Sequence, residues 1–386
     1  MKIIYIAPYP PEKDGIGNYT KRTVDDFRSR GKDVAVISNI KDGLADEKDL
    51  YRLMSYHPLY ILKFIIKLFA LRPNIVHLQY TVSLYGFYSF VLYFALFLLR
   101  ITTNTKLIVT MHEVKRETDL LKTPGVFFYK FFLMPFDLVY VHTHEAQDIL
   151  RNVCFIPPEK VKVIPHGLYT FSSAAMQEVD IDALYGIKKR YILFFGYIHI
   201  HKGIEYLIDA YNILYQKDPD LVKDIELVIA GEVRERTSIF KFFGNLDKSY
   251  KKLLIDKVKG YNLVDKIRFI GYVDDKHVYS FIKKSFCIVL PYIKTEQSGV
   301  LNTAINANKP IIASGIGGLK ETLEDTGLLV PPYNSMELAN KLEKLIVDHN
   351  YYEQKVATYA TLQDELKIDK INDNIFSNYL TLTNGI

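Results

Sequence analysis

Residues 295–329, TEQSGVLNTAINANKPIIASGIGGLKETLEDTGLL, decide the fold class of this chain. A polar segment leads into a helix opened by Ser298 and Gly299, a strand follows at residues 310–313, and a second glycine turn begins at Gly315. The end of a strand and the start of a helix are thus brought together twice, with glycine where backbone must approach a ligand closely. Backbone N–H groups at such junctions bind phosphate. The stretch therefore predicts an α/β domain that holds a phosphate-bearing ligand.

Length and composition predict a globular enzyme of two domains. The chain has 386 residues, more than one hydrophobic core normally serves, so two domains of roughly 150 to 200 residues each are expected. The hydrophobic content of 49% and the charged content of 24% exclude a disordered or fibrous chain. Residues 1–170 hold 22 Lys and Arg against 16 Asp and Glu, so the basic surplus of the +5 net charge lies in the first half.

The cysteines and the N-terminus predict a cytoplasmic protein. Cys154 and Cys287 lie far apart without a CxxC or Cys/His cluster, so buried, reduced thiols are expected instead of a disulfide or a zinc site. The opening run MKIIYIAPYPPEKDG has too short an apolar stretch for a signal peptide and predicts a first strand.

A glycine loop follows this first strand at residues 2–7. The loop contains Gly15 and Gly17 and leads into a helix at residues 20–30, which makes half of a Rossmann unit. Thr20 stands where the third glycine of GxGxxG would be. The loop is therefore either a tight structural turn or a ligand-facing loop, and the sequence leaves both open.

Residues 51–72 predict a basic amphipathic helix. Arg52, Lys63 and Lys67 would project from one side of it, and residues 51–100 contain five Arg or Lys and no Asp or Glu. Such a segment can lie at an anionic membrane surface. A long core-packing helix is the equally weighted alternative. The apolar side of the helix would carry Leu62, Ile65, Ile66 and Phe69.

The uncharged run at residues 83–99 predicts a buried crossover helix. It is slightly short for a bilayer-crossing helix, and strand-like runs at residues 74–79 and 106–111 flank it closely. His112 follows the second strand, and ligands in open α/β sheets bind beyond the carboxyl ends of strands. His112 is therefore a candidate site residue, with a buried structural histidine as the alternative, and His77 is the weaker candidate.

The remaining chain repeats the alternation of strands and helices. A polar stretch after Gly167 predicts a linker, and the strand at residues 191–195 starts a second Rossmann-like domain. In chain order the motifs are PPEKDGIGNYT, TMHE, VIPHG, FFGYIHIHKGIEYLIDA, LVIAGE, IRFIGYV, EQSGVLNTAINANKPIIASGIGGLKE and GLLVPP. In this order they resemble the retaining GT-B glycosyltransferases of family 4 across nearly the whole chain.

The resemblance implies an α/β fold with two Rossmann-like domains that face each other across a cleft. The expected parts are an acceptor-binding domain at residues 1–170, a linker at 171–190, a nucleotide-sugar donor domain at 191–363, and a C-terminal helix at 364–386 that crosses back to the first domain. The implied partners are a UDP- or GDP-sugar, which is a substrate and not a cofactor, and a glycan or lipid-linked acceptor.

The resemblance also implies roles for single residues. Lys202 in HKG matches the family's diphosphate-binding cation, and a fixed cation there would stabilise the charge that the leaving diphosphate gains. His112 matches the histidine near the donor sugar, and Glu296 matches the first acidic residue of a Glu-x7-Glu signature; both are counted with Lys202 as catalytic. The expected donor-phosphate contacts are Gly15, Gly17, Ser298, Gly299, Val300 and Leu301. The expected nucleoside contacts are Tyr272, Val273 and Thr303.

Two positions depart from the family pattern. Tyr197 stands where the family commonly places an arginine, so a second phosphate cation is missing unless His199 or His201 replaces it. The second glutamate is also absent, and Thr303 or Ala304 occupies its place. Thr303 offers one hydroxyl where a carboxylate would accept two ribose hydrogen bonds.

The resulting hypothesis is a retaining, metal-independent hexosyltransferase of cell-surface polysaccharide or glycolipid synthesis. Its expected place is the cytoplasm, with peripheral contact to anionic membrane through residues 51–100 as an option. The alternatives are a catalytically weakened nucleotide-sugar-binding subunit and a GT-B-fold epimerase. Nucleic-acid binding is not expected, because the basic residues are interleaved with an apolar face instead of lining a polar groove.

Overall fold

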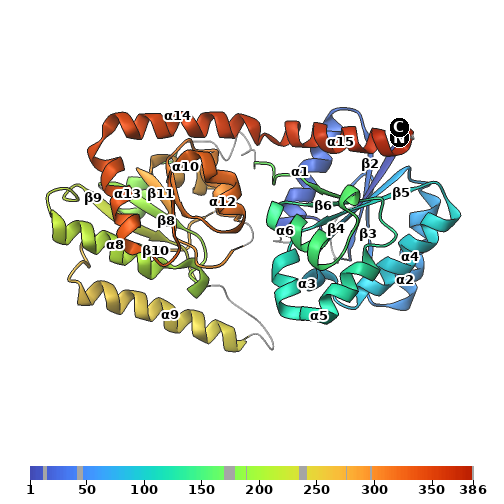
Figure 1. Cartoon of the computed structure of the whole chain (residues 1–386), viewed down its shortest axis with the longest axis horizontal. Helices are drawn as coiled ribbons and strands as arrows, with labels where there is room; N and C mark the ends of the chain where they lie inside the picture. The colour runs from blue at the N-terminus through green and yellow to red at the C-terminus, as the bar shows by residue number, and fades with distance from the viewer. Residues whose placement is uncertain are drawn as a thin grey trace. The chain divides into compact units, whose positions relative to one another are not determined.

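The chain forms two compact units, shown in the computed structural model of Figure 1. The N-terminal unit comprises Met1–Gly167 and Lys367–Ile386, and the C-terminal unit comprises Leu168–Leu366. Within the expected linker at 171–190, residues 171–178 and 188 lie outside the residues that the structure describes, and the described part contains the short helix α7 (Ile181–Tyr185). The described residues are 1–11, 15–40, 47–168, 179–187, 189–233, 241–274, 276–295 and 298–384.

The N-terminal unit is built on a parallel sheet of seven strands in the order β3-β2-β1-β4-β5-β6-β7. The central strands are rich in Ile, Val and Leu and buried on both faces, as strands of a parallel sheet covered by helices must be. The strands are β1 (Lys2–Ile6), β2 (Asp33–Asn39), β3 (Leu50–Met54), β4 (Ile75–Tyr80), β5 (Lys106–Met111), β6 (Leu138–Val141) and β7 (Val161–Val163).

Helices cover both faces of this sheet. On one face, buried residues of α2, α4 and α5 form a single core with the strands. On the other face, α1 packs with the last helix of the chain, α15. The helices are α1 (Gly15–Ser29), α2 (Pro58–Ala70), α3 (Val82–Tyr85), α4 (Tyr88–Thr102), α5 (Val114–Phe132), α6 (His144–Asp148) and α15 (Ile368–Asn384), with a π-helical turn at Ile149–Val153 and a 3-10 turn at Pro158–Lys160.

The C-terminal unit is built on a parallel sheet of six strands in the order β10-β9-β8-β11-β12-β13. Both sheets therefore have the Rossmann strand order. In this order the first three strands are added toward one edge of the sheet and the later ones toward the other edge, so the order reverses between the first and fourth strands. In this unit the reversal lies between β8 and β11. The strands are β8 (Arg190–Phe195), β9 (Ile225–Ala230), β10 (Ile267–Gly271), β11 (Cys287–Leu290), β12 (Ile311–Ser314) and β13 (Leu329–Val330).

Two sets of helices enclose this second sheet. Helix α8 packs against α9 and α13, whereas α11 packs against α10 and α14. The helices are α7 (Ile181–Tyr185), α8 (Ile204–Lys217), α9 (Lys241–Gly260), α10 (Val278–Lys284), α11 (Gly299–Ile305), α12 (Gly317–Leu323), α13 (Ser335–Val347) and α14 (His349–Glu365), with 3-10 turns at Ile200–Lys202 and Glu324–Thr326.

The end of the chain returns to the N-terminal unit, as the fold class predicted. Helix α15, red in Figure 1, lies beside α1. Its buried face includes Ile375 and Tyr379. The Tyr379 hydroxyl contacts the Tyr5 hydroxyl at 2.8 Å and also Nδ1 of His77. His77, whose Nε2 lies 2.7 Å from the Thr110 hydroxyl, is thus a satisfied core histidine. The 17-residue helix α15 at the end of the chain therefore completes, through Tyr379, a buried polar cluster with side chains of the first sheet.

The structure corrects the expected helix at residues 51–72. Its first residues form the strand β3, so Arg52 is not helical, and the Arg52 guanidinium donates to the Pro10 carbonyl at 2.6 Å. Helix α2 begins only at Pro58. Its buried residues are Phe64 and Leu68, while Leu62 and Ile66 of the predicted packing side are exposed. The basic and exposed apolar residues therefore share one face.

The crossover helix predicted at residues 83–99 is present as α4, with the short α3 before it. It is only half-buried, because Leu92 and Leu96 pack into the core while Phe90 and Phe94 face outward. No helix in the described part of the chain is both long enough and apolar enough to cross a membrane.

We predict that Tyr379→Phe destabilises the N-terminal unit. The substitution leaves the Tyr5 hydroxyl and the His77 ring nitrogen without this partner, and an unsatisfied buried polar group costs about 1–3 kcal/mol. Urea denaturation followed by circular dichroism should show a loss of that size. Leu380→Gln is the matched control, since Leu380 is exposed on the same helix. Equal stability of Tyr379→Phe and wild type would contradict the prediction.

Candidate active site

Lys202 lies at the carboxyl edge of the second sheet, where ligands of such sheets bind. It ends the 3-10 turn Ile200–Lys202 that follows β8. The next residue, Gly203, has φ of 58°, and a Cβ there would overlap the carbonyl oxygen of Pro291 in the loop after β11. Glycine at 203 therefore allows the loops after β8 and β11 to touch at the point where the strand order reverses.

Lys202 is connected to Ser298 through Tyr292. The Lys202 ammonium lies 3.6 Å from the centre of the buried Tyr292 ring, an attractive cation–π geometry. The Tyr292 hydroxyl is 3.4 Å from the Ser298 hydroxyl. The structure thus brings together two residues that the sequence separates by nearly 100 positions. Tyr292 was missed from sequence, although its place directly after β11 could have indicated it.

The two loops also share backbone hydrogen bonds and positive charge. The His201 carbonyl accepts from the Ile293 N–H at 3.0 Å. Desolvation and the nearby Lys294 and Lys202 charges lower the pKa of His201, which favours its uncharged form. His199 is turned toward Asp247 of α9, at 3.4 Å from Nε2 to Oδ1. Lys294 is a second cation near His201 that sequence analysis missed.

Ser298 caps helix α11 with its side chain. The Ser298 hydroxyl accepts from the Leu301 N–H at 3.3 Å, so this N–H, expected to face phosphate, is bonded within the cap. The Thr303 hydroxyl donates to the Gly299 carbonyl at 3.1 Å. Val300 lies against Gly196 at the end of β8. Glu296 lies outside the described residues.

The expected nucleobase loop is at the same edge of the sheet, after β10. Tyr272 is exposed and Val273 is buried. The exposed Tyr272 ring can therefore contact a ligand directly, whereas the buried Val273 can contact one only through its backbone. Tyr197, which replaces the family arginine, is also exposed.

In the N-terminal unit, His112 joins a cluster of buried and half-buried rings at the carboxyl ends of β5 and β6. Its Nδ1 is 3.3 Å from His142 Nε2, and its Nε2 is 2.8 Å from the Gln79 side-chain amide. The ring of Tyr19, on α1, contacts His112, His142 and His166. His142, which follows β6 as His112 follows β5, was missed although the same rule would have found it.

These histidines are held neutral. Burial is the main cause that lowers the pKa of His142 to about 4 and of His166 to about 3, and it lowers that of His112 well below its usual value. The neighbouring imidazoles lower the pKa of His112 and His166 further. His142 Nδ1 lies 2.9 Å from the Ile164 carbonyl and donates to it. His112 Nε2 faces Oε1 of the Gln79 side chain.

The glycine loop of this unit is only partly described, because residues 12–14 are not. Gly15 is the first residue of α1, and a Cβ at Gly17 would come within 3.4 Å of the Pro8 backbone. Gly17 therefore has at least a structural role. Within the described ranges, no three His, Cys, Asp or Glu side chains gather as a metal site requires.

Two family models together match most of the chain: "Glycosyltransferase Family 4" at residues 13–170 and "Glycosyl transferases group 1" at residues 182–361. The chain belongs to the family 4 glycosyltransferases. A curated relative, alpha-D-kanosaminyltransferase of Streptomyces kanamyceticus, is 27% identical over 230 residues, which is 57% of this chain and 54% of the relative. The chain thus spans about half the length of the curated relatives it matches.

Solved structures confirm the GT-B fold of this family 4 chain. Sucrose-phosphate synthase of Thermosynechococcus elongatus superposes with a TM-score of 0.71 at 20% identity, covering 100% of both chains. The Anabaena protein HepE, solved in complex with UDP and glucose, has a TM-score of 0.70 at 17% identity, covering 98% of this chain and 99% of that one. At these identities the likeness establishes the fold alone.

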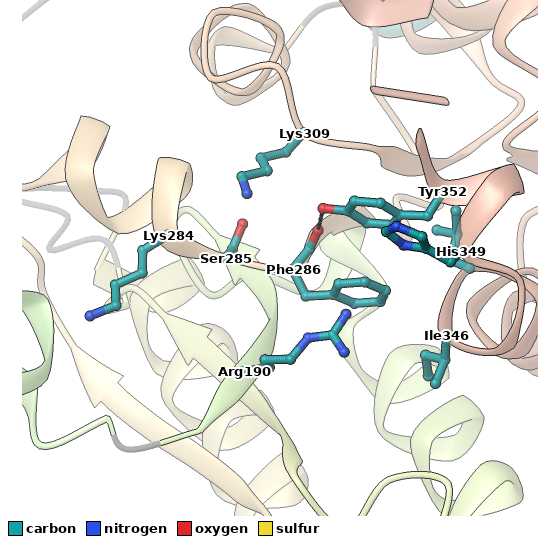
Figure 2. A pocket seen from close by; sticks show the side chains of 9 residues that line it. Arg190, Lys284, Ser285, Phe286, Lys309, Ile346, His349 and Tyr352 are labelled. Atoms are coloured by element: carbon teal, nitrogen blue, oxygen red, sulfur yellow. Dashed lines mark hydrogen bonds between the residues drawn. The ribbon is translucent and has the colours of Figure 1, made fainter. Parts of the chain in front are cut away.

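A basic cavity of about 340 Å³ lies at the opposite, amino-terminal edge of the second sheet. Arg190 begins β8, and Phe286 and Lys309 precede β11 and β12. Figure 2 shows the Phe286 ring between Arg190 and Tyr352; the two aromatic rings are stacked at 4.8 Å. None of the predicted donor residues lines this cavity. It is therefore separate from the candidate site around Lys202.

We predict that the histidine cluster makes stability fall with acid. The unfolded histidine binds a proton near pH 6.5, whereas folded His142 does so only near pH 4, so the stability is complete above pH 6.5 and is lost as the pH falls toward 4. At pH 5 the loss is about 2 kcal/mol for such a histidine. Thermal unfolding at pH 7, 6 and 5 checks this, and His142→Asn should flatten the profile. An unchanged profile in that variant would contradict the assignment.

Proposed function

We propose that this chain is a retaining glycosyltransferase that moves a sugar from a nucleotide-sugar donor to an acceptor hydroxyl. The observation that carries the proposal is Lys202 on a glycine-fixed turn beside Tyr292 and Ser298, where the strand order reverses. Family membership supports the reaction class. The relatives' names, which include a kanosaminyltransferase, support a sugar as the transferred group.

In the proposed reaction, the bond between the sugar anomeric carbon and the leaving phosphate breaks while a bond to the acceptor oxygen forms on the same face. The proton of the acceptor hydroxyl passes to the leaving phosphate. Lys202, with Lys294 in the loop that His201 contacts, offsets the negative charge that develops on the diphosphate. No metal ion has a part in this proposal, and Ser298, Gly299, Val300 and Gly15 keep their assignment as donor contacts.

We assign His112 to contact with the donor sugar and Glu296 to the sugar or its phosphates. A neutral imidazole suits His112, because it exchanges hydrogen bonds with sugar hydroxyls without placing a positive charge against them. Its position on Gln79 and His142 keeps the ring orientation fixed. Tyr272, Val273 and Thr303 are assigned to the nucleoside, with Thr303 supplying at most one hydrogen bond.

We further propose a glycan or lipid-linked acceptor and a place at the inner face of the membrane. Residues 51–100 supply the proposed peripheral contact with anionic membrane. The support is chemical: this stretch carries no acidic residue, and Lys63 lies exposed on α2 between Leu62 and Ile66. Cell-surface polysaccharide or glycolipid synthesis would use such an acceptor.

A weakened nucleotide-sugar-binding subunit is the second candidate. Two observations favour it: Tyr197 replaces the arginine that would add phosphate charge, and the Thr303 hydroxyl is bonded to the Gly299 carbonyl. Donor binding without transfer to any acceptor would establish this alternative.

We predict that Lys202→Ala lowers kcat by on the order of 10²-fold or more, since it removes a group that stabilises developing charge. Release of the nucleoside diphosphate is the measurement. Lys309→Ala is the matched control, because Lys309 lies in the cavity at the opposite edge of the same sheet. Unchanged turnover in Lys202→Ala, with the control also unchanged, would refute the role of Lys202.

A panel of UDP-, GDP- and ADP-sugars should identify the donor by thermal shift. A ligand present at 100 times its Kd stabilises the folded state by about 2.7 kcal/mol. We expect one base to raise the unfolding temperature by several degrees and Lys202→Ala to lose that rise. No shift with any nucleotide sugar would contradict donor binding.

A further inference from the structure

We propose that a phenylalanine-rich outer face of the N-terminal unit inserts into an anionic bilayer. This "phenylalanine face" consists of exposed side chains on α4, α5 and α2. It rests on the membrane contact proposed above for residues 51–100, names the side chains of that stretch that enter the bilayer, and extends the contact to α5. The members are Phe87, Phe90, Phe94, Phe97, Ile101, Phe127, Phe131, Met134, Leu59, Leu62 and Ile66.

Helix α4 supplies the central stripe. Phe90, Phe94, Phe97 and Ile101 recur at intervals of three and four, so they share one side of the helix. All are exposed, Phe94 by 63%, and Phe87 just before the helix is 82% exposed. The opposite side, with Leu92, Leu96 and Leu99, is buried against the sheet. The helix is thus apolar all round, although one side faces away from the protein.

Helix α5 continues this stripe. Its second half starts after a break at Lys122, where φ is 51°, and contains Pro124. In that half Phe127, exposed by 68%, is followed by exposed Phe131 at an interval of four and, just beyond the end of the helix, by exposed Met134. The Phe131 ring lies 4.3 Å from the Tyr93 ring, which stacks on Phe97 at 5.9 Å. The exposed residues of α4 and α5 therefore form one connected surface.

Helix α2 adds a third, more basic stripe. Leu59, Leu62 and Ile66 are exposed on one side of it, with Lys63 among them. The helix joins α4 through Tyr88, whose ring contacts Tyr56 at 5.6 Å and Phe64 at 6.3 Å. In Figure 1 the α2 and α4 labels lie side by side on the same side of the sheet. Apolar patches of this extent on a folded protein mark an interaction site.

The charges around this face select an anionic bilayer as its occupant. No Asp or Glu occurs between Leu50 and His112 or between Leu120 and Phe136. Lys63, Lys122 and Lys130 are exposed within these stretches. Lysine and phenylalanine together are the composition of helices that lie in the headgroup region, where anionic lipid supplies the opposite charge.

Two other occupants fit less well. A second copy of the chain would place lysines against lysines in a symmetric contact, with no acidic residue to pair with them. A transmembrane arrangement is excluded for α4 because its 15 residues span about 22 Å, whereas the hydrocarbon core is about 30 Å thick. The face is therefore suited to lie in the interface and not to cross it.

The test is flotation of the full chain with vesicles of phosphatidylcholine and phosphatidylglycerol (7:3). The triple variant Phe90→Gln, Phe94→Gln and Phe127→Gln should bind these vesicles at least tenfold more weakly, because three apolar side chains lose their transfer into the bilayer. Glutamine is a good helix former, and the three positions are exposed, so the fold is expected to persist. Circular dichroism and thermal unfolding verify this.

The matched control is Leu253→Gln with Val347→Gln, two exposed apolar residues of the C-terminal unit. It should bind as wild type does. Lys63→Glu with Lys67→Glu separately tests the electrostatic part, which 0.5 M NaCl should weaken. Nucleoside diphosphate release with a water-soluble acceptor is followed in all variants, and it should be unchanged by the phenylalanine substitutions.

The outcomes separate the two proposals. If wild type floats and the triple variant floats equally, the phenylalanine face is overturned while peripheral membrane contact stands. If wild type does not float with either anionic or pure phosphatidylcholine vesicles, the phenylalanine face and the peripheral membrane contact are both overturned. Diphosphate release then still tests the proposed sugar transfer. If wild type fails to float but forms a dimer that the triple variant loses, the face binds a second copy and the bilayer is excluded.

Discussion

The contact between Gly203 and the Pro291 carbonyl fixes the geometry on which the donor side of the molecule depends. No side chain fits between them, so the turn after β8 can lie directly on the loop after β11. This contact places the His201 carbonyl within 3.0 Å of the Ile293 N–H and sets Lys202 over Tyr292. A larger residue at 203 would separate the loops and, with them, the lysine from Ser298. The reversal of strand order between β8 and β11 makes the loops after these two strands neighbours, and glycine at 203 allows their backbones to touch.

The two units handle polar groups in opposite ways. The N-terminal unit holds the clustered His112, His142 and His166 without charge, because desolvation disfavours imidazolium and neighbouring imidazoles repel it. The C-terminal unit instead keeps Lys202 half-buried over an aromatic ring, next to His201, whose pKa is lowered. Neutral rings suit hydroxyl-rich ligands, whereas a held cation suits a leaving group that becomes more negative. This division of chemistry agrees with the donor and acceptor roles proposed for a family 4 glycosyltransferase.

Much of the fold was predictable because each strand is a short, continuous apolar run bounded by turn residues. Strands β1, β5, β8 and β12 lie within one residue of their predicted positions. The strand β3 was missed, since LYRLM reads as the start of the amphipathic segment that follows it. Its strand character comes from pairing with β2, which the local sequence does not encode. His112 was found because it follows a strand, and Lys202 because the motif HKG resembles the family's; Tyr292, Lys294 and His142 also follow strands but were not singled out.

The sequence by itself determined the family, the order of the two Rossmann-like halves and the placement of glycine at the strand ends, because these depend on local patterns of apolar and turn residues. Only the tertiary structure decided which side of each helix is covered. Helix α4 is apolar on every side, so no periodicity could tell that Leu92 is buried while Phe94 is exposed. It also decided which distant side chains meet, as Lys202 does with Tyr292 and Tyr379 with His77. Such contacts depend on where the sheet places the loops and helices that follow its strands. That placement is set by the packing of the whole unit and not by any local stretch of sequence.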